Sequence, residues 1–435
     1  MSEYEVELGD VVEVLRGYAD CSFDAIIADP PYGLSFMGKK WDYAVPDAGL
    51  WREALRVCKP GAPLIAFSGT RTYHRTVVQI EDAGWEIRDC LAWMYGSGFP
   101  KSLDVSKAID AAAGAVREVV GRKRHARDGD VSHQPSSLRA QSNEVYGSTS
   151  NPRVGFETAP ATDAARAWAG YGTALKPAFE PAVLARKPLD GTNAQNVARW
   201  GVGGLAIDAS RIESATPIQK TAGGLGGYSG HDGAEYAKGT GAEFRNGGRW
   251  PANVLLDEAA GALLDAQSGN RPSASNTGPT TGGKIFAKGE GIPQYANGNP
   301  YLGETGGASR FFYCAKAARK ERDAGLEGLP HRTGAECTGS KEGQARLDSP
   351  RTGAGRGEGG KNHHPTVKPI ALMAYLARLI MPPNPGAILV PFAGSGSEMI
   401  GCLQAGWPSV LGIEREAEYV EIARRRLAHH TKVAK

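Results

Sequence analysis

The chain has 435 residues, of which 58 are glycine, and its formal net charge is +3. Glycine makes up only ~7% of an average protein, so long irregular segments are expected here. Because the net charge is small, it indicates nothing about the binding partners of the protein. A nucleic-acid-binding surface would have to come from local clusters of basic residues.

The sequence also disfavours a zinc-binding protein, a disulfide-stabilised protein and a membrane protein. The six cysteines contain no CxxC pair, which argues against a zinc site and against a disulfide framework and suits a reducing cytoplasm. Residues 1–10 lack the basic and apolar regions of a signal peptide. No apolar run approaches the ~20 residues of a membrane span, so we expect a cytoplasmic protein with no membrane contact.

Residues 8–100 are predicted to form a compact α/β unit. The pattern predicts, in chain order, a helix at 11–16, a strand at 25–28, a helix at 48–57, a strand at 63–67, a helix at 73–83 and a strand at 87–94. Alternating strands and helices of these lengths are typical of a mostly parallel sheet with helices on both faces.

The middle of the chain differs from its ends in composition and in hydrophobic pattern. Four windows are polar and without hydrophobic periodicity, namely 113–165, 213–248, 268–308 and 328–362. Core-like pieces separate them at 168–189, 249–257 and 309–317, and the last two are predicted to be strands. Since long structureless insertions are either disordered or functional, these windows suggest a site for a large, irregular partner.

Regular patterns return near the C-terminus. We predict a helix at 370–380, then a strand, a glycine-rich turn and a helix across 386–406. A strand at 409–414 ends on an acidic residue, and a helix follows at 416–430.

The stretch "LVPFAGSGS" suggests a cofactor site. Its turn contains Gly394 and Gly396, and glycines permit tight turns and the close approach of a ligand to the backbone. Glu414, at the tip of the next strand, is suitably spaced to bind the two ribose hydroxyls of an adenosine. Because neither GxGxxG nor a P-loop lysine is present, a nucleoside cofactor is favoured over NAD or ATP. A plain strand-to-helix turn with a surface glutamate is the alternative.

The stretch "ADPPY" suggests a second site. Pro30 and Pro31 fix φ and direct the Asp29 carboxylate and the Pro30 carbonyl outward from the carboxyl end of a strand. These two acceptors suit one amino group with two hydrogens, and Tyr32 offers a flat face to a planar base. The alternative is a proline-rich turn after an edge strand.

Together, these two stretches resemble those of the DNA amino-methyltransferases, which transfer a methyl group from S-adenosylmethionine to the exocyclic nitrogen of adenine or cytosine. The DPPY motif precedes the cofactor glycines, as in the beta subgroup, whose motif order is a circular permutation of the common methyltransferase sheet. The similarity covers 5–110 and 363–430 well. It covers the strand pieces at 171–188, 249–256 and 309–317 more loosely.

The resemblance implies roles for individual residues. Asp29, Pro30, Pro31 and Tyr32 would be catalytic. The implied S-adenosyl-L-methionine site contains Asp10 near the adenine amino group, His364, Thr366 and Lys368 over the methionine moiety, Pro391, Phe392, Ala393, Gly394, Ser395 and Gly396 in the turn, and Glu414.

Two departures from the family pattern stand out. Val390 occupies the position of the usual aspartate before Pro391, and Ser397 that of the usual threonine. The missing carboxylate would have been close to the cofactor. Either another group, such as His364 or Thr366, supplies the polarity or the affinity is weaker.

The implied fold is an α/β, Rossmann-like S-adenosylmethionine-dependent methyltransferase sheet with helices on both faces, permuted motif order and large irregular insertions. Residues 1–112 would form its catalytic half, 113–362 a target-recognition and insertion region with some core strands, and 363–435 the cofactor-binding half. We expect the four polar windows to be mobile without DNA and some of them to order on the duplex.

The implied function is methylation of the exocyclic N6 of adenine in double-stranded DNA, with the base flipped out of the helix. Residues 33–42 would close over that base, with Lys39 and Lys40 near phosphates, and the basic run at 122–127 could follow the DNA backbone. N4-cytosine methylation, RNA or protein methylation, and a nucleic-acid-binding protein with a decayed methyltransferase core stay open as alternatives. The sequence leaves open a homodimer and a restriction endonuclease partner.

Overall fold

The computed structural model describes residues 3–34, 42–96, 98, 102–122, 156–214, 218–219, 244–245, 248–272, 305–315, 321–333, 360–364 and 366–433. Most of the four polar windows, the loop at 35–41 and the basic run from 123 onward are outside these ranges. The predictions made for those segments therefore concern residues that the structure does not describe.

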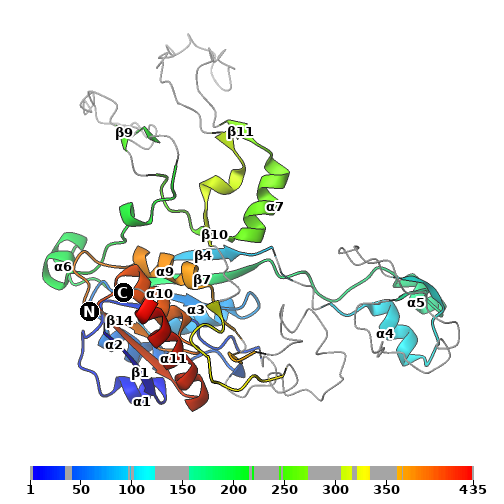
Figure 1. The fold of residues 1–435 in the computed structure, drawn as a ribbon, viewed down its shortest axis with the longest axis horizontal. Coiled ribbons are helices and arrows are strands. Elements are labelled where there is room, and N and C mark those ends of the chain that lie inside the picture. Colours follow the sequence, from blue (N-terminus) through cyan, green and yellow to red (C-terminus); the bar gives the residue numbers. More distant parts are fainter. Residues whose placement is uncertain are drawn as a thin grey trace, which may run out of the picture.

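A nine-stranded sheet forms the centre of the described part of the molecule (Figure 1). Its order is β1 (Glu3–Leu8), β15 (Ser409–Glu414), β14 (Ala387–Val390), β2 (Ala25–Ala28), β3 (Pro63–Phe67), β7 (Phe179–Arg186), β4 (Glu86–Met94), β10 (Val254–Asp257) and β13 (Tyr313–Ala315). All neighbours are parallel except β7, which is antiparallel to both β3 and β4. The pairing of β14 with β2 joins the two ends of the chain in one sheet, and the predicted α/β fold is confirmed.

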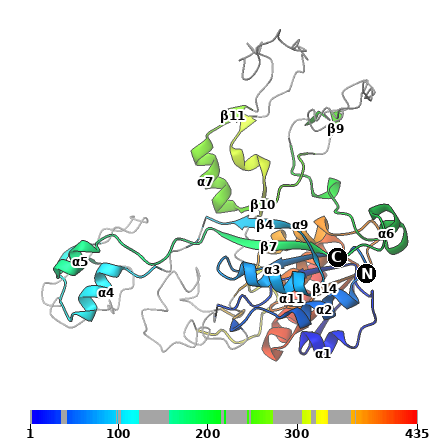
Figure 2. The ribbon, with the colours of Figure 1, turned by 180° about the vertical axis from the view of Figure 1, so that it is seen from behind.

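Helices cover both faces of this sheet, as predicted (Figure 2). Alternate residues of β2 point to opposite faces: Ile26 and Ala28 pack in the cluster that contains Trp51, whereas Ala25 and Ile27 pack in the cluster that contains Met373. The first face carries α1 (Val11–Leu15), α2 (Ala48–Val57) and α3 (Tyr73–Asp82). The second carries α9 (Ile370–Leu379), α10 (Ser397–Ala405) and α11 (Ala417–Val433).

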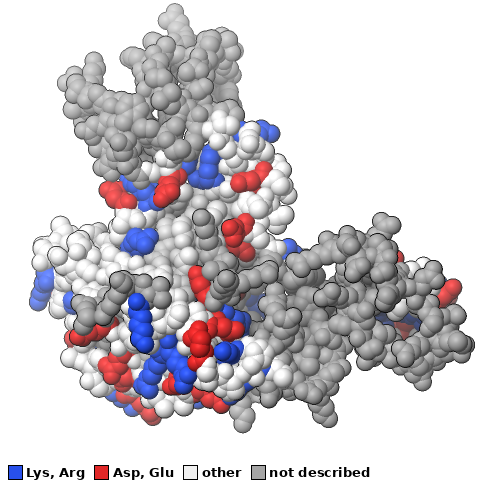
Figure 3. Space-filling view, viewed as in Figure 1, with Lys and Arg blue, Asp and Glu red and all other residues white. Residues whose placement is uncertain are grey.

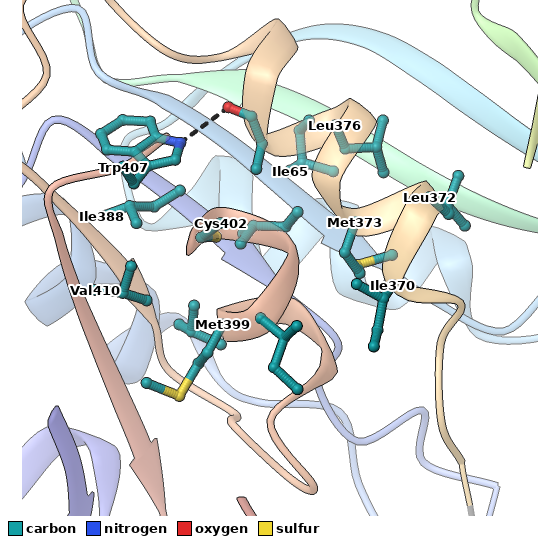
Figure 4. Close-up of a cluster of buried hydrophobic side chains, with 14 of the residues drawn as sticks. Ile65, Ile370, Leu372, Met373, Leu376, Ile388, Met399, Cys402, Trp407 and Val410 are labelled. Carbon is teal, nitrogen blue, oxygen red and sulfur yellow. Dashed lines mark hydrogen bonds between the residues drawn. The ribbon is translucent and has the colours of Figure 1, made fainter. Parts of the chain in front are cut away.

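The contact between α9 and α10 is close because Gly401 has no side chain. A Cβ atom at Gly401 would be 2.5 Å from the Cβ of Met373. The indole N–H of Trp407 donates a 3.0 Å hydrogen bond to the carbonyl of Ala377 and ties the end of α10 to α9 (Figure 4). These contacts fix α10, which begins directly after the glycine turn.

A small unit extends from β4 and β7, away from the main sheet in both views (Figures 1 and 2). It contains α4 (Val105–Ala112), β5 (Val119–Arg122), β6 (Phe156–Thr158) and α5 (Asp163–Ala167). The buried Asp110 accepts hydrogen bonds from Arg117 at 2.6 Å and from the N–H groups of Ala161 and Thr162 at 2.9 and 3.0 Å. The prediction that 113–165 is irregular throughout is therefore wrong at both ends of that window.

Several other elements differ from the prediction. The edge strand β1 was not predicted, since among its residues only Val6 is buried. Helices α6 (Asn193–Trp200) and α7 (Glu258–Ser268) were also missed. At 309–317 the strand is limited to Tyr313–Ala315, because a 3₁₀ turn occupies Ala308–Phe311.

Two short antiparallel pairs complete the described structure, β8 (Ile218–Gln219) with β9 (Phe244–Arg245) and β11 (Arg271–Pro272) with β12 (Thr305–Gly306). Within the described ranges, no helix combines the length and the hydropathy that crossing a bilayer requires.

Candidate active site

A cavity of about 1090 Å³ opens at the carboxyl ends of β2, β14 and β15. These strands are neighbours in the sheet, so the segments that follow them meet at one edge, where ligands bind in open α/β sheets. Thirteen of the fifteen predicted site residues line this cavity: Asp10, Asp29, Pro30, Pro31, Tyr32, His364, Thr366, Lys368, Pro391, Phe392, Gly394, Ser395 and Glu414.

The other two predicted residues, Ala393 and Gly396, are not part of the lining. Ala393 is fully buried, and its N–H donates to the carbonyl of Ile413. Gly396 has a φ of +82°, and a Cβ there would be 3.2 Å from Ala423 on α11. Both residues support the turn from behind.

Gly394 is required by the ring of His364. Its φ is +50°, and a Cβ at this position would be 2.9 Å from the Nε2 atom of His364. Burial lowers the pKa of His364 to about 4, so its imidazole is neutral near pH 7. The His364 Nδ1 atom contacts the carbonyl of Thr366, and the ring meets Tyr419 edge to face at 4.5 Å.

A buried ionic cluster surrounds Asp29. The ammonium of Lys368 is 2.8 Å from Asp29 Oδ2 and 3.2 Å from Glu180 Oε2. The hydroxyl of Tyr32 donates to Asp29 Oδ1 at 2.8 Å and accepts from Lys368 at 3.0 Å. Lys368 was predicted only as a cofactor residue, and Glu180 was not predicted at all.

The cluster keeps its charges. Burial alone would lower the pKa of Lys368, but the carboxylates of Asp29 and Glu180 hold that pKa above its ordinary value. Burial, together with the same two carboxylates, raises the pKa of Tyr32 well above its usual value. Lys368 is therefore a cation and Tyr32 a hydrogen-bond donor at neutral pH. Each Asp29 oxygen still has a free lone pair, because a carboxylate offers about four acceptor positions.

Asp42 fixes the turn that follows Asp29. Its buried carboxylate accepts hydrogen bonds from the N–H groups of Tyr32 at 2.7 Å, Gly33 at 2.9 Å and Leu34 at 3.3 Å. This role was not predicted, because Asp42 is ten positions from Tyr32 in the chain and no local motif links the two residues.

Two carboxylates mark the other end of the cavity. Glu414 accepts hydrogen bonds from the N–H groups of Gly394 and Glu416, both at 2.9 Å. Burial raises the pKa of Glu414 above its ordinary value. One oxygen of Asp10 caps α1 through the N–H of Val12 at 2.9 Å.

A buried guanidinium supports the glycine turn. Arg426 donates to the Ser395 carbonyl at 2.6 Å and to the hydroxyls of Ser395 and Ser397 at 3.0 Å each. The two serine hydroxyls are therefore engaged beneath the turn. Arg426 was not predicted, since "ARRRL" reads as an ordinary helix face.

The charge of the cavity wall favours a cationic ligand. Among the lining residues that the structure describes, seven are acidic and four are basic, while His364 is neutral. The acidic set is Asp10, Asp29, Asp42, Glu180, Glu398, Glu414 and Glu416, and the basic set is Arg71, Lys176, Lys368 and Arg415. On the face shown in Figure 3, basic and acidic side chains are interspersed over the described surface.

Comparisons with known proteins give one sequence relative of note. No family model matches the chain. The "Putative methylase YubD" of Escherichia coli (strain K12) is 41% identical over 69 residues, which are 16% of this chain and 30% of that protein. The chain thus spans less than a third of this relative's length.

Solved structures give weaker similarities. M1.HpyAVI matches with a TM-score of 0.37 and 12% identity over 98% of both chains. The cytosine-N4-specific PvuII DNA methyltransferase matches with a TM-score of 0.36 and 10% identity over 98% of this chain and 86% of its own. TM-scores this low establish no common fold.

Proposed function

We propose that this chain is a DNA methyltransferase that uses S-adenosyl-L-methionine to methylate the exocyclic N6 of adenine in double-stranded DNA. The observation that carries the proposal is the single cavity shared by the Asp29–Tyr32 turn, the glycine turn and Glu414. Its volume, about 1090 Å³, is at the upper end of the ~300–1,000 Å³ of small-molecule pockets. Such a space suits a nucleoside cofactor together with one base. The short match to a methylase agrees with methyl transfer.

The residues at the Glu414 end fit this cofactor. The Glu414 and Asp10 carboxylates suit the ribose hydroxyls and the adenine amino group as acceptors. The excess of acidic lining suits the cationic sulfonium and disfavours phosphate-bearing cofactors. When bound, S-adenosylmethionine supplies an electrophilic methyl group.

The Asp29 end fits an exocyclic amine. Asp29 and the Pro30 carbonyl accept hydrogen bonds from the two amine hydrogens, which favours a more tetrahedral nitrogen with an available lone pair. Lys368 and Tyr32 hold the Asp29 carboxylate in one orientation, and Asp42 holds the turn. Positioning of this kind supplies most of the acceleration. The proton that the amine loses after methyl transfer leaves through Asp29.

A base within a duplex cannot reach this cavity, so the target must be flipped out, at a cost of a few kcal/mol. Tyr32 lines the cavity beside Asp29 and offers its ring to the flipped base. N4-cytosine is the second candidate, since its exocyclic amine presents the same two hydrogens; relatives that act on cytosine more often carry serine in place of Asp29.

The alternative that is not an enzyme is a nucleic-acid-binding protein with a decayed methyltransferase core. The intact ionic cluster at Asp29 disfavours it, because an unused buried cluster of four polar groups would be costly to keep. Long-read sequencing of DNA from cells that express the chain tests the proposal. We expect N6-methyladenine in one sequence context. Unmodified DNA would contradict the proposal, and N4-methylcytosine would favour the second candidate.

A further inference from the structure

Glu398 is a buried carboxylate that no step above uses. It occupies the first turn of α10, directly after the glycine turn, and lines the cavity with only 5% of its surface exposed. Within the described ranges, the only hydrogen bond that affects its pKa comes from its own N–H. A buried charge without a partner is unfavourable. A cation in the cavity would therefore bind favourably beside this carboxylate.

The two nearby cationic side chains already bind other residues. Lys368 is held by Asp29 and Glu180 at 2.8 and 3.2 Å, and Arg426 is held by the serines of the turn. Both lower the pKa of Glu398 through space, but neither forms an ion pair with it among the described residues. The remaining titratable neighbours are Asp29 from β2 and the Cys402 thiol from α10 itself.

This environment makes Glu398 responsive near neutral pH. Burial, with a smaller effect from Asp29, raises the pKa of its carboxyl to about 7. The group is therefore about half ionised at pH 7, and a cation bound beside it would complete the ionisation.

We propose that the Glu398 carboxylate binds the α-ammonium group of the methionine moiety of S-adenosylmethionine, an inference that rests on the function proposed above. An ammonium offers three N–H donors to a carboxylate, whereas a sulfonium offers none. The charged neighbours of Glu398 include Asp29 and Lys368 at the reacting end, where the methionine side of the cofactor would be found, and Arg426 behind the glycine turn. Glu414 is not among the groups that shift the pKa of Glu398. At 390 the side chain is a fully buried valine, so no carboxylate is available there.

Calorimetry with three ligands tests this assignment. S-adenosylmethionine carries the ammonium and a cationic sulfonium, whereas 5′-deoxy-5′-methylthioadenosine has the same nucleoside with a neutral thioether sulfur and no amino acid. S-adenosylhomocysteine, which keeps the ammonium beside a neutral thioether, separates the two charges and should behave like S-adenosylmethionine in this comparison. We expect Glu398→Gln to weaken S-adenosylmethionine binding at least about tenfold and to change methylthioadenosine binding less than about twofold. Glu321→Gln is the matched control, because burial also raises the pKa of Glu321 beside Arg426, yet Glu321 does not line the cavity.

A pH comparison on the unaltered protein needs no variant. Between pH 6.0 and 7.2 an α-ammonium stays mostly protonated, and His364 stays neutral because its pKa is about 4. Ionisation of Glu398 should strengthen S-adenosylmethionine binding about fivefold over this interval. Methylthioadenosine binding should stay constant, and Glu398→Gln should remove the dependence.

The possible results distinguish a failure of the proposed function from a failure of the role given to Glu398. If the unaltered chain binds none of these ligands, the proposed function itself fails. If it binds S-adenosylmethionine with an affinity that neither Glu398→Gln nor pH alters, the role of Glu398 is refuted and the function is not. An equal loss of S-adenosylmethionine and methylthioadenosine binding in a folded Glu398→Gln variant would also refute the ammonium contact, because it would indicate a merely structural role.

Discussion

The ammonium of Lys368 is 2.8 Å from the carboxylate of Asp29, although 339 positions separate the two residues in the chain. The pair joins the segment before α9 to the end of β2. Both side chains are at least nine-tenths buried, with exposed fractions of 5% and 10%. In the proposed reaction, Lys368 and Tyr32 would hold the Asp29 carboxylate in place, and the incoming amine would use the lone pairs that these two residues leave.

Replacing Lys368 by methionine should destabilise the protein strongly. The change leaves the buried Asp29 carboxylate without its cation, and such a loss costs about 3–5 kcal/mol; the partly exposed Glu180 loses the same partner. Chemical denaturation of Lys368→Met measures this loss, with the exposed Lys176→Met as control, expected within about 0.5 kcal/mol of the unaltered protein. The carboxylates raise the pKa of Lys368 above 10.5, so its contribution is complete below pH 10.5 and is lost only as pH rises further. A loss no larger than that of Lys176→Met would contradict the assignment to this pair.

Asp42→Ala should slow methyl transfer without weakening cofactor binding. The variant removes the acceptor for the N–H groups of Tyr32, Gly33 and Leu34, so the turn that carries the catalytic groups shifts. A displacement of about 1 Å can cost about 100-fold in rate. Single-turnover methylation assays measure the rate, and Asp42→Asn, which keeps one acceptor oxygen, should recover part of it. Equal rates for all three proteins would show that Asp42 does not position the site.

Glu414→Ala should weaken S-adenosylmethionine binding by about 1.5–3 kcal/mol through the loss of charge-assisted hydrogen bonds. Titration calorimetry measures the change. Glu421→Ala removes an exposed carboxylate that pairs with Arg425 on α11, outside the cavity lining, and should leave the affinity unchanged. Equal affinities for the Glu414 variant and the unaltered protein would remove Glu414 from the cofactor site.

Gly396→Ala should destabilise the protein by roughly 1–3 kcal/mol, because φ is +82° and the new methyl group would press on Ala423. Gly204→Ala is the matched control, since nothing is within 4 Å of its would-be Cβ and its φ is outside the left-handed region. Denaturant midpoints compare the two. If both variants were equally stable, the support role given to Gly396 would be wrong.

Local patterns were enough to predict most of the central sheet. Strands β2, β3, β14 and β15 are short apolar runs that end at a turn; the bounds of β2, β3 and β15 agree with the prediction, and β14 is within the predicted 386–406 stretch. Strand β1 has a single buried residue, so its pairing with β15 supplies what its own pattern lacks. The outer unit was missed because Asp110 holds it together, and its backbone partners at Ala161 and Thr162 are 51 and 52 positions away in the chain.

In the candidate site, too, some residues were predictable from local motifs and others were not. Asp29 and Gly394 were identifiable because their local motifs restrict the backbone. Asp42, Glu180 and Arg426 act through contacts between distant segments, and a single acidic or basic residue in a sequence does not indicate its partner. The contact between Lys368 and Asp29 was not predictable from the motif around Lys368, since the pairing of β14 with β2 brings the two segments together.

Methyl transfer by Asp29→Ala tests the central claim most directly. The assay follows tritium from labelled S-adenosylmethionine into plasmid DNA and then identifies the labelled base after hydrolysis. The unaltered protein should place the label in N6-methyladenine, and Asp29→Ala should transfer none while cofactor binding stays nearly intact. Label that enters DNA at an undiminished rate with Asp29→Ala, or no label in DNA from the unaltered protein, would contradict the account.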